Sequence, residues 1–390
     1  MRGVPGVRSR VLGRWARPRA LRAPAACAAA ALALAGCATA GTAGVTVSGH
    51  RLTIYASEPP GLSGGQVAAD VIDAERLAFD AGGGRVGDYT VAFRVLHEPE
   101  TSDDARAAIE DQSAIAYLGE IVPGTSQVSL EITNQLDLLQ VSPTDTAVYL
   151  TQATPSVPGS PDRFYPSLSS YHRTFARVVP TTAQEARAIV ARMRALGAGS
   201  VYVASDGGLY GSSIAAEVRA DAPAEGLTLA GDPASAGAVF YGSSSPGAAA
   251  AELDRAAAAG RAALFVPSAL YSDSLAAALS PAAQQRLYVS VPGFAPGSEP
   301  AAAAAFERAF AAHYGHAPVP QAVFGYEAMA AVLAVLREAG SRADQRATVV
   351  RDFLAIRDRA SVLGTYSLHD GDTTLAPFIF ARVRDGRLSP

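Results

Sequence analysis

From about residue 50, the chain alternates between two hydrophobic patterns. Short apolar runs with many β-branched and aromatic residues are typical of strands, and the longer segments between them have apolar positions at helical spacing. The predicted strands are Leu52–Tyr55, Tyr89–Leu96, Ile115–Leu118, Leu138–Val141, Ser200–Ala204, Ala238–Tyr241, Ala262–Val266 and Leu287–Val291. This alternation predicts an α/β fold in which parallel sheets are covered by helices on both faces.

The helical segments each carry one apolar face. Apolar positions recur at i, i+4, i+7 and i+11 from Val67 to Ala78, and a similar stripe runs from Ala186 to Leu196. Thr182 and Glu185 have the spacing of a capping box at the start of the second segment. Gly197 stands where a left-handed residue can end that helix.

The C-terminal part predicts three consecutive helices and a closing pair of strands. These are Ala301–Tyr314, Gln321–Ala339 and Arg346–Ile356, followed by Gly364–Leu368 paired with Pro377–Arg384. Asp370-Gly371-Asp372 lacks the other positions of a calcium loop and is interpreted as the hairpin turn. So many elements exceed one ordinary core, and we therefore expect two sheets. The proline-containing stretch Thr151–Tyr171 would end the first unit.

Residues 1–36 have the pattern of an export signal. Seven Arg residues precede an apolar stretch, Ala23–Ala35, that is too short to span a bilayer. The tetrad Leu34-Ala35-Gly36-Cys37 resembles the lipobox of bacterial lipoproteins. This resemblance implies that Cys37 is joined to a diacylglycerol unit and that residues 37–49 begin the mature chain as a short tether. The alternative is an ordinary cleaved signal in which Cys37 has no role.

Composition restricts the chemistry of the mature chain. Of the two Cys residues, Cys27 leaves with the signal and Cys37 carries the lipid, so a disulfide, a Cys nucleophile and a Cys metal site are excluded. All 32 basic residues are Arg, and seven of them lie in the signal, against 36 acidic residues. The mature chain is therefore acidic, which argues against nucleic acid as a partner. No other apolar run is long enough to span a bilayer, so we expect a soluble body tied to the membrane.

Two glycine motifs suggest enzymes, but their context does not fit. Residues 82–87 match GxGxxG, yet they follow a helix and precede a strand, the reverse of a dinucleotide site, and are interpreted as a turn. Residues 61–65 match the GxSxG of serine hydrolases, and His369 follows later in the chain. A proline-containing loop separates Ser63 from its strand, so Ser63 fits a helix N-cap better. The six His residues lack metal-binding spacing, and we expect no metal or cofactor.

Polar loops follow four predicted strands, at the edge where parallel α/β sheets bind ligands. These loops are residues 119–126, 142–146, 205–211 and 242–245. Their Gly, Ser and Thr residues leave backbone N–H groups free at helix starts, where they can hold a carboxylate or a similar anion. Ser and Thr are also the commonest helix caps, so a single loop says little. Four such loops predict a ligand cleft.

Several motifs occur in a characteristic order from about residue 50 to residue 388. They include Tyr117-Leu118-Gly119, Gly124-Thr125-Ser126, Gln140-Val141-Ser142-Pro143, Tyr171-His172-Arg173-Thr174, Tyr210-Gly211, Gly325-Tyr326-Glu327-Ala328 and Gly364-Thr365-Tyr366. Together they resemble the type 1 periplasmic binding proteins, in the leucine/isoleucine/valine-binding branch that feeds ABC importers. The resemblance implies two Rossmann-like lobes with parallel sheets, joined by a three-strand hinge. Lobe 1 would contain residues 50–174 and 294–363, and lobe 2 residues 175–293 and 364–390.

The resemblance also implies a ligand site between the lobes. In the family, lobe 1 holds a ligand carboxylate through the loops that match residues 124–126 and 144–146. Lobe 2 contributes a tyrosine and an acidic residue, and Ser244 and Ser268 stand near those positions here. An unpaired buried ammonium is costly, so Asp206 or Glu120 is expected to replace the missing acid. The predicted ligand-binding residues are Glu120, Gly124, Thr125, Ser126, Thr144, Thr146, Asp206, Tyr210, Ser244 and Ser268.

These patterns predict an extracytoplasmic solute-binding lipoprotein rather than an enzyme. It would bind a small amino-acid-like solute of the branched-chain type, close over it at the hinge and deliver it to ABC permease subunits. We expect a monomer, anchored by lipid to the outer face of the cell membrane. The alternatives are a ligand sensor of the same fold, a pair of lobes without a ligand, or a serine hydrolase that uses Ser63.

Overall fold

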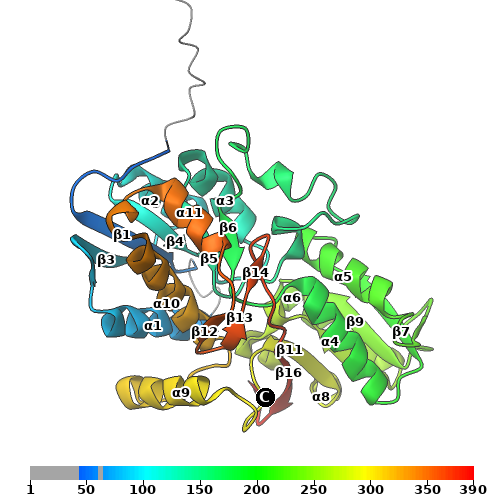
Figure 1. Cartoon of the computed structure of the whole chain (residues 1–390). Helices are drawn as coiled ribbons and strands as arrows, with labels where there is room; N and C mark the ends of the chain where they lie inside the picture. The colour runs from blue at the N-terminus through cyan, green and yellow to red at the C-terminus, as the bar shows by residue number, and fades with distance from the viewer. Residues whose placement is uncertain (1–43, 60–64) are drawn as a thin grey trace, which may run out of the picture. The chain divides into compact units, whose positions relative to one another are not determined.

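The N-terminal part of the chain forms a six-stranded sheet in a computed structural model that describes residues 44–59 and 65–390 (Figure 1). Its strands are β1 (Arg51–Ser57), β2 (Arg85–Val86), β3 (Tyr89–Leu96), β4 (Ala114–Leu118), β5 (Leu139–Ser142) and β6 (Phe175–Arg177). Their order is β2-β3-β1-β4-β5-β6, and every pair is parallel except β2 with β3. The associated helices are α1 (Gly65–Gly82), α2 (Thr101–Glu110), α3 (Ser126–Thr133), α9 (Ala301–Tyr314), α10 (Ala322–Ala339) and α11 (Arg346–Leu354). We call this sheet with its helices lobe 1.

A seven-stranded sheet with its own helices forms lobe 2. Its strands are β7 (Ser200–Ser205), β8 (Thr228–Leu229), β9 (Ala238–Gly242), β10 (Ala263–Val266), β11 (Leu287–Pro292), β16 (Phe378–Arg384) and β17 (Arg387–Ser389). The order is β17-β16-β11-β10-β9-β7-β8, parallel from β8 to β11 and antiparallel beyond. The helices are α4 (Thr182–Ala195), α5 (Leu209–Asp221), α6 (Pro246–Ala259), α7 (Asp273–Ala278) and α8 (Pro281–Gln284). The predicted α/β class with two mainly parallel sheets is confirmed.

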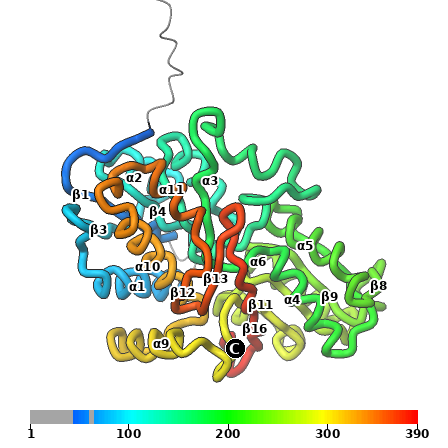
Figure 2. Tube along the Cα trace, in the orientation of Figure 1, coloured from blue at the N-terminus to red at the C-terminus, as the bar shows by residue number. Residues whose placement is uncertain are grey.

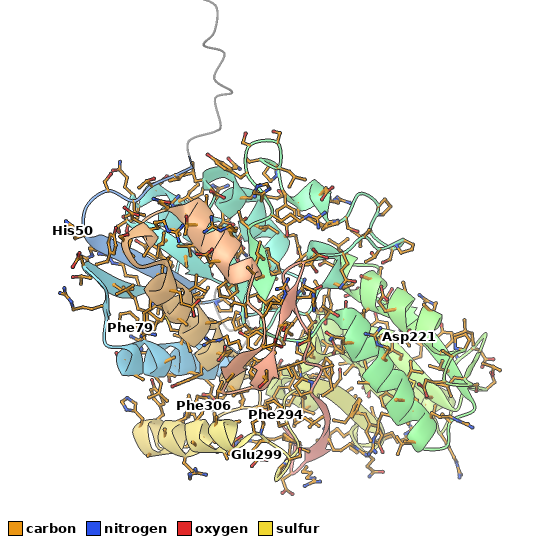
Figure 3. All side chains as sticks on the ribbon, viewed as in Figure 1. His50, Phe79, Asp221, Phe294, Glu299 and Phe306 are labelled. Atoms are coloured by element: carbon orange, nitrogen blue, oxygen red, sulfur yellow. The ribbon has the colours of Figure 1, made fainter. Side chains whose placement is uncertain are left out.

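The core of lobe 1 is built from both ends of the chain. Helix α10 returns to pack against α1, so that this orange helix from the C-terminal part lies beside the blue N-terminal one (Figure 2). Phe306 of α9, labelled in Figure 3, has its ring centre 5.2 Å from that of Tyr326 on α10. The buried apolar core of lobe 1 contains residues of the N-terminal sheet and of the C-terminal helices. The C-terminal helices are therefore required to cover the sheet and keep its apolar residues from water.

The two lobes share one apolar cluster. Tyr149, Phe164 and Phe175 of lobe 1 belong to the same buried group as Ile189 of α4 and Ile214 of α5. Phe164 of the proline-containing stretch is therefore buried in this shared cluster, although much of the stretch is exposed. Any separation of the lobes must leave this cluster intact or expose it to water.

The chain passes between the lobes three times, after β6, after β11 and before β16. A buried ion pair joins two of these passages, because Arg177 Nε lies 2.9 Å from Asp372 Oδ1. The Thr151 hydroxyl and the Gln152 amide also donate to Asp372. Arg177 Nη1 donates to the backbone oxygen of Asp145 at 2.8 Å. The passages are thus tied to the loop that follows β5.

Two local predictions were wrong. The capping box of α4 is formed by Thr181 and Gln184, one residue earlier than predicted, which leaves Glu185 free to be buried elsewhere. The predicted closing pair does not form, because β16 extends the lobe 2 sheet beside β11. Residues 364–366 form β13 and pair with β12 (Arg359–Ser361). The turn at Asp370 instead joins two short strands, β14 (Leu368–His369) and β15 (Asp372–Thr373).

The other local predictions agree with the structure. The eight predicted strands and the three C-terminal helices are present, with ends within two residues of those expected. Gly197 has the left-handed φ of 85° that ends a helix, and residues 83–84 form the turn predicted for the GxGxxG match. The predictions for Cys37 and Ser63 concern residues outside the described part of the chain. No helix among the described residues is long and apolar enough to cross a membrane.

Candidate ligand-binding cleft

A cavity of about 660 Å³ lies between the lobes, within the range of small-molecule sites. Lobe 1 contributes Gly65, Gln66, Val67, Ile121, Val122, Pro123, Thr144, Val319 and Gln321. Lobe 2 contributes Ser244, Pro246, Ser268, Ala269, Tyr271, Ser272, Asp273, Ser274, Pro292, Arg387 and Leu388. The wall includes residues that follow β4, β5, β9 and β10, at the carboxyl ends of the strands where parallel sheets bind ligands.

Three long helices begin at this cavity. Gly65 is the first residue of α1, Pro246 is the first residue of α6, and Gln321 directly precedes α10. The first backbone N–H groups of a helix lack intrahelical acceptors and carry partial positive charge. These helix starts therefore provide donors for oxygen atoms of a solute.

Two buried polar side chains in the wall have unsatisfied atoms. Gln321 is 4% exposed and its Oε1 accepts no hydrogen bond, and Ser268 is 7% exposed and its Oγ makes none of good geometry. Buried polar atoms are nearly always paired, so each such atom calls for a partner. A solute in the cavity can supply that partner.

An acidic side chain that the sequence did not single out as a ligand contact lies behind Ser268. Glu185 Oε1 accepts a hydrogen bond from the Ser268 backbone N–H at 2.6 Å and another from the Ser290 hydroxyl. Burial raises the pKa of Glu185, and the hydrogen bond from Ser290 opposes this rise. The acid expected near Ser268 is thus present in space, but it comes from α4. This role was missed in the sequence because Glu185 was assigned to a capping box.

The loops predicted to hold a ligand carboxylate instead hold a carboxylate of the chain. Asp145 Oδ1 accepts hydrogen bonds from Gly124 N at 2.8 Å and Ala147 N at 2.9 Å. Asp145 Oδ2 accepts one from Ser126 N at 3.0 Å. The side chain is completely buried. Asp145 lies between two residues predicted as ligand contacts, but an acid at that position was not interpreted as a substitute for the ligand.

A tyrosine from lobe 2 covers the same loops. The Tyr210 hydroxyl lies 3.1 Å from the Thr146 hydroxyl, within hydrogen-bond distance. Gly124 has a φ of 85°, and a Cβ placed on it would lie 2.7 Å from the Cβ of Tyr210. The lobes are therefore in direct contact here, and Gly124, Thr146 and Tyr210 do not line the cavity.

The predicted residues thus fall into groups. Thr144, Ser244 and Ser268 line the cavity, whereas the other predicted residues do not. Thr125 and Ser126 are used in hydrogen bonds within lobe 1, since the Thr125 hydroxyl donates to Val122 O and the Ser126 hydroxyl accepts from Glu120 N.

The two acids proposed to face a ligand ammonium also point elsewhere. Glu120 is 2% exposed, and its carboxylate accepts a hydrogen bond from the Tyr117 hydroxyl at 2.8 Å inside lobe 1. Burial raises the pKa of Glu120 from 4.5 to about 7, while hydrogen bonds from Ser129 and Tyr117 oppose the rise. Asp206 accepts from Gly208 N and from the Ser243 hydroxyl on the surface of lobe 2.

Acidic groups surround the cavity more than basic ones do. Asp273 lines it, and buried Asp70 accepts hydrogen bonds from the lining residues Gln66 and Val319. Arg387, which is exposed, is the one basic residue in the described wall. Within residues 44–59 and 65–390, no group of three or more His, Cys, Asp and Glu side chains could hold a metal ion.

Residues 233–387 match the family model for periplasmic binding proteins. No sequence among the curated proteins matches the chain. The structure is similar to an ABC transporter substrate-binding protein from Desulfitobacterium hafniense in complex with leucine. The identity is 17%, the match covers 87% of this chain and 99% of that one, and the TM-score is 0.67.

Two further solved structures have the same fold. A leucine-binding protein from Thermotoga maritima has 17% identity over 87% of this chain and 97% of its own, with a TM-score of 0.69. An ABC transporter solute-binding protein from R. palustris, in complex with benzoate, has 17% identity over 87% of this chain and 94% of its own, with a TM-score of 0.64. The resemblance found in the sequence is therefore confirmed, and the chain has the fold of the type 1 periplasmic binding proteins.

Proposed function

We propose that this chain is the extracytoplasmic solute-binding component of an ABC importer. It binds a small amino-acid-like solute between its lobes and presents the closed complex to permease subunits. It acts as a monomer, and a lipid on Cys37 anchors it to the outer face of the cell membrane. The proposed lobes are residues 50–177 with 294–363 and residues 178–293 with 364–390; the boundary predicted at residue 174 moves to 177 because β6 pairs with β5 in the lobe 1 sheet.

The observation that carries this proposal is the unsatisfied Oε1 of Gln321 in a cavity that both lobes line. A buried acceptor without a partner costs about 1–3 kcal/mol, and a bound solute with a donor group removes that cost. The helix starts at the same cavity add donors for the solute's oxygen atoms. A solute held by both lobes stabilises their closed arrangement relative to any open one.

Three passages between the lobes support closure at a hinge. The buried pair of Arg177 and Asp372 joins two of them, so the hinge side is held while the cavity side can open. The expected movement is a rotation of one lobe against the other. X-ray scattering should then give a smaller radius of gyration when a solute is bound, and an unchanged curve with the site occupied would contradict hinge closure.

A thermal-shift screen over amino acids, amino-acid amides and sugars tests binding. At a concentration of 100 times its Kd, a solute should stabilise the protein by about 2.7 kcal/mol. Gln321→Leu should lose this gain, whereas Gln285→Leu, on the exposed surface outside the cavity, should keep it. A wild-type protein that no compound stabilises would contradict solute binding.

The anchor needs a separate test, because it concerns residues before the described part of the chain. Cells that express the full chain should incorporate a labelled fatty acid into it, and Cys37→Ala should abolish the label. Equal labelling of both proteins would exclude Cys37 as the acceptor.

A further inference from the structure

We propose that the solute presents N–H donors and carries no carboxylate, because Asp145 already supplies the carboxylate that the lobe 1 loops bind. This inference rests on the proposed function and narrows its solute class from amino acids to amines or amides related to them. It reverses the expectation from the sequence, which assigned the donors of residues 124–126 to a ligand carboxylate.

The loop donors are already used. Gly124 N, Ser126 N and Ala147 N all donate to Asp145, at 2.8, 3.0 and 2.9 Å. Hydrogen bonds to a charged acceptor are the stronger kind, and three of them on one carboxylate leave no advantage in exchanging it for another. A solute carboxylate would have to displace a covalently attached one.

The hydroxyl groups of the same loops are also used. The Thr144 hydroxyl, at the cavity wall, donates to Ile121 O, and the Thr125 hydroxyl donates to Val122 O. Tyr210 from lobe 2 closes the remaining approach through its contacts with Gly124 and Thr146. Although Ile121, Val122, Pro123 and Thr144 line the cavity, an anion there therefore finds the backbone N–H groups of residues 124–126 already used in hydrogen bonds.

The cavity itself favours donors over a second carboxylate. Asp273 in the wall, Asp70 behind Gln66 and Glu185 behind Ser268 place acidic side chains on both lobes. Like charges at short range in a partly buried site repel each other strongly. An amine or amide N–H can instead donate to Gln321 Oε1, which has no other partner. Carbonyl or hydroxyl oxygens of such a solute suit the helix starts of α1, α6 and α10.

Matched compounds test the solute class. Leucine, leucinamide and 3-methylbutylamine share one side chain and differ in the carboxylate. In calorimetric titrations of the wild-type mature chain, leucinamide or the amine should bind at least about tenfold more tightly than leucine. This ratio corresponds to about 1.4 kcal/mol. Leucine that binds as tightly as its amide would overturn the inference while leaving the proposed function standing.

A second experiment tests the role of Asp145 even if none of these compounds binds, an outcome that would count against the proposed function alone. Asp145→Ala should expose three free N–H groups, so sodium acetate should raise its Tm more than sodium chloride at equal ionic strength. The wild-type Tm should not distinguish the two salts. Asp145→Asn, which keeps one acceptor oxygen, should give an intermediate result and guards against an Ala variant that does not fold. An acetate effect equal to that of chloride in both variants would overturn the inference.

Discussion

The lobe 1 loops after β4 and β5 and the wall of the cavity contain the same kinds of residue, but they differ in whether their polar groups are satisfied. In the loops, the backbone N–H groups of Gly124 and Ser126 both donate to the carboxylate of Asp145, so these donors have partners within the chain. In the wall, Gln321 and Ser268 keep unsatisfied atoms although both are almost fully buried. Small polar residues after a strand therefore mark the ligand edge of a sheet, whereas polar atoms without a partner remain in the wall of the cavity.

The largest expected effect comes from detaching the loops from the hinge. Arg177→Met leaves Asp372 buried without its cation and frees the carbonyl of Asp145. Breaking a buried ion pair on one side costs about 3–5 kcal/mol. Urea unfolding should report a loss of this size. The control is Arg173→Met, whose pair with Asp162 is solvent-exposed and should contribute less than about 1 kcal/mol. Equal losses would mean that the buried pair does not secure the loops.

The stability of the protein should depend on pH through Glu120, which lies in the lobe 1 loop after β4. The pKa of Glu120 rises from 4.5 to about 7 in the folded chain. Because the folded value is the higher one, its contribution to stability is complete below about pH 4 and is lost as the pH rises through about 7. The free energy of unfolding should therefore fall by up to about 3 kcal/mol between those limits.

Glu120→Gln should remove this fall, which urea unfolding at pH 5 and pH 8 can measure. The matched control is Glu110→Gln, which changes an exposed carboxylate at the end of α2 and should retain the wild-type dependence. A Glu120→Gln variant with an unchanged pH profile would contradict the raised pKa of Glu120.

An intermediate effect is expected at the contact between the lobes. Gly124→Ala combines a φ of 85° with a Cβ only 2.7 Å from the Cβ of Tyr210. Overpacking of this kind costs about 1–3 kcal/mol beyond the strain of the backbone. Gly207→Ala isolates the backbone strain, because its φ is 80° and nothing lies within 4 Å of the added Cβ. In thermal unfolding, Gly124→Ala should have a lower Tm than Gly207→Ala. A higher Tm for Gly124→Ala would contradict the contact with Tyr210.

The smallest effect is expected in the cavity wall. Gln321→Leu removes a buried acceptor that has no partner, so the free energy of unfolding should not fall. Gln140→Leu is the comparison, since the Gln140 amide donates to Ser129 Oγ at 2.8 Å and accepts from Thr133 Oγ1 at 2.7 Å. Its loss leaves buried groups unpaired and should cost more than about 2 kcal/mol. Equal costs for the two glutamines would remove the distinction between a satisfied and an unsatisfied region.

Local patterns in the sequence predicted most of the fold. The strand Tyr89–Leu96 and the helix Ala301–Tyr314 have the predicted ends, because periodic burial depends on residues near one another in the chain. The prediction of a closing strand pair was wrong, because β16 pairs with β11, which lies about 90 residues earlier in the sequence. The one-residue error in the cap of α4 hid the buried position of Glu185.

The amino-acid sequence by itself determined the α/β class, the order of the elements and the polar loops at the ends of the strands, because these depend on periodicity and on residue type. Only the tertiary structure decided which polar groups meet. Asp145 reaches Gly124 across 21 positions, and Thr151 reaches Asp372 across 221. Hydrogen bonds between distant segments depend on packing rather than on local pattern. The sequence alone therefore could not show that the lobe 1 loops bind the carboxylate of Asp145.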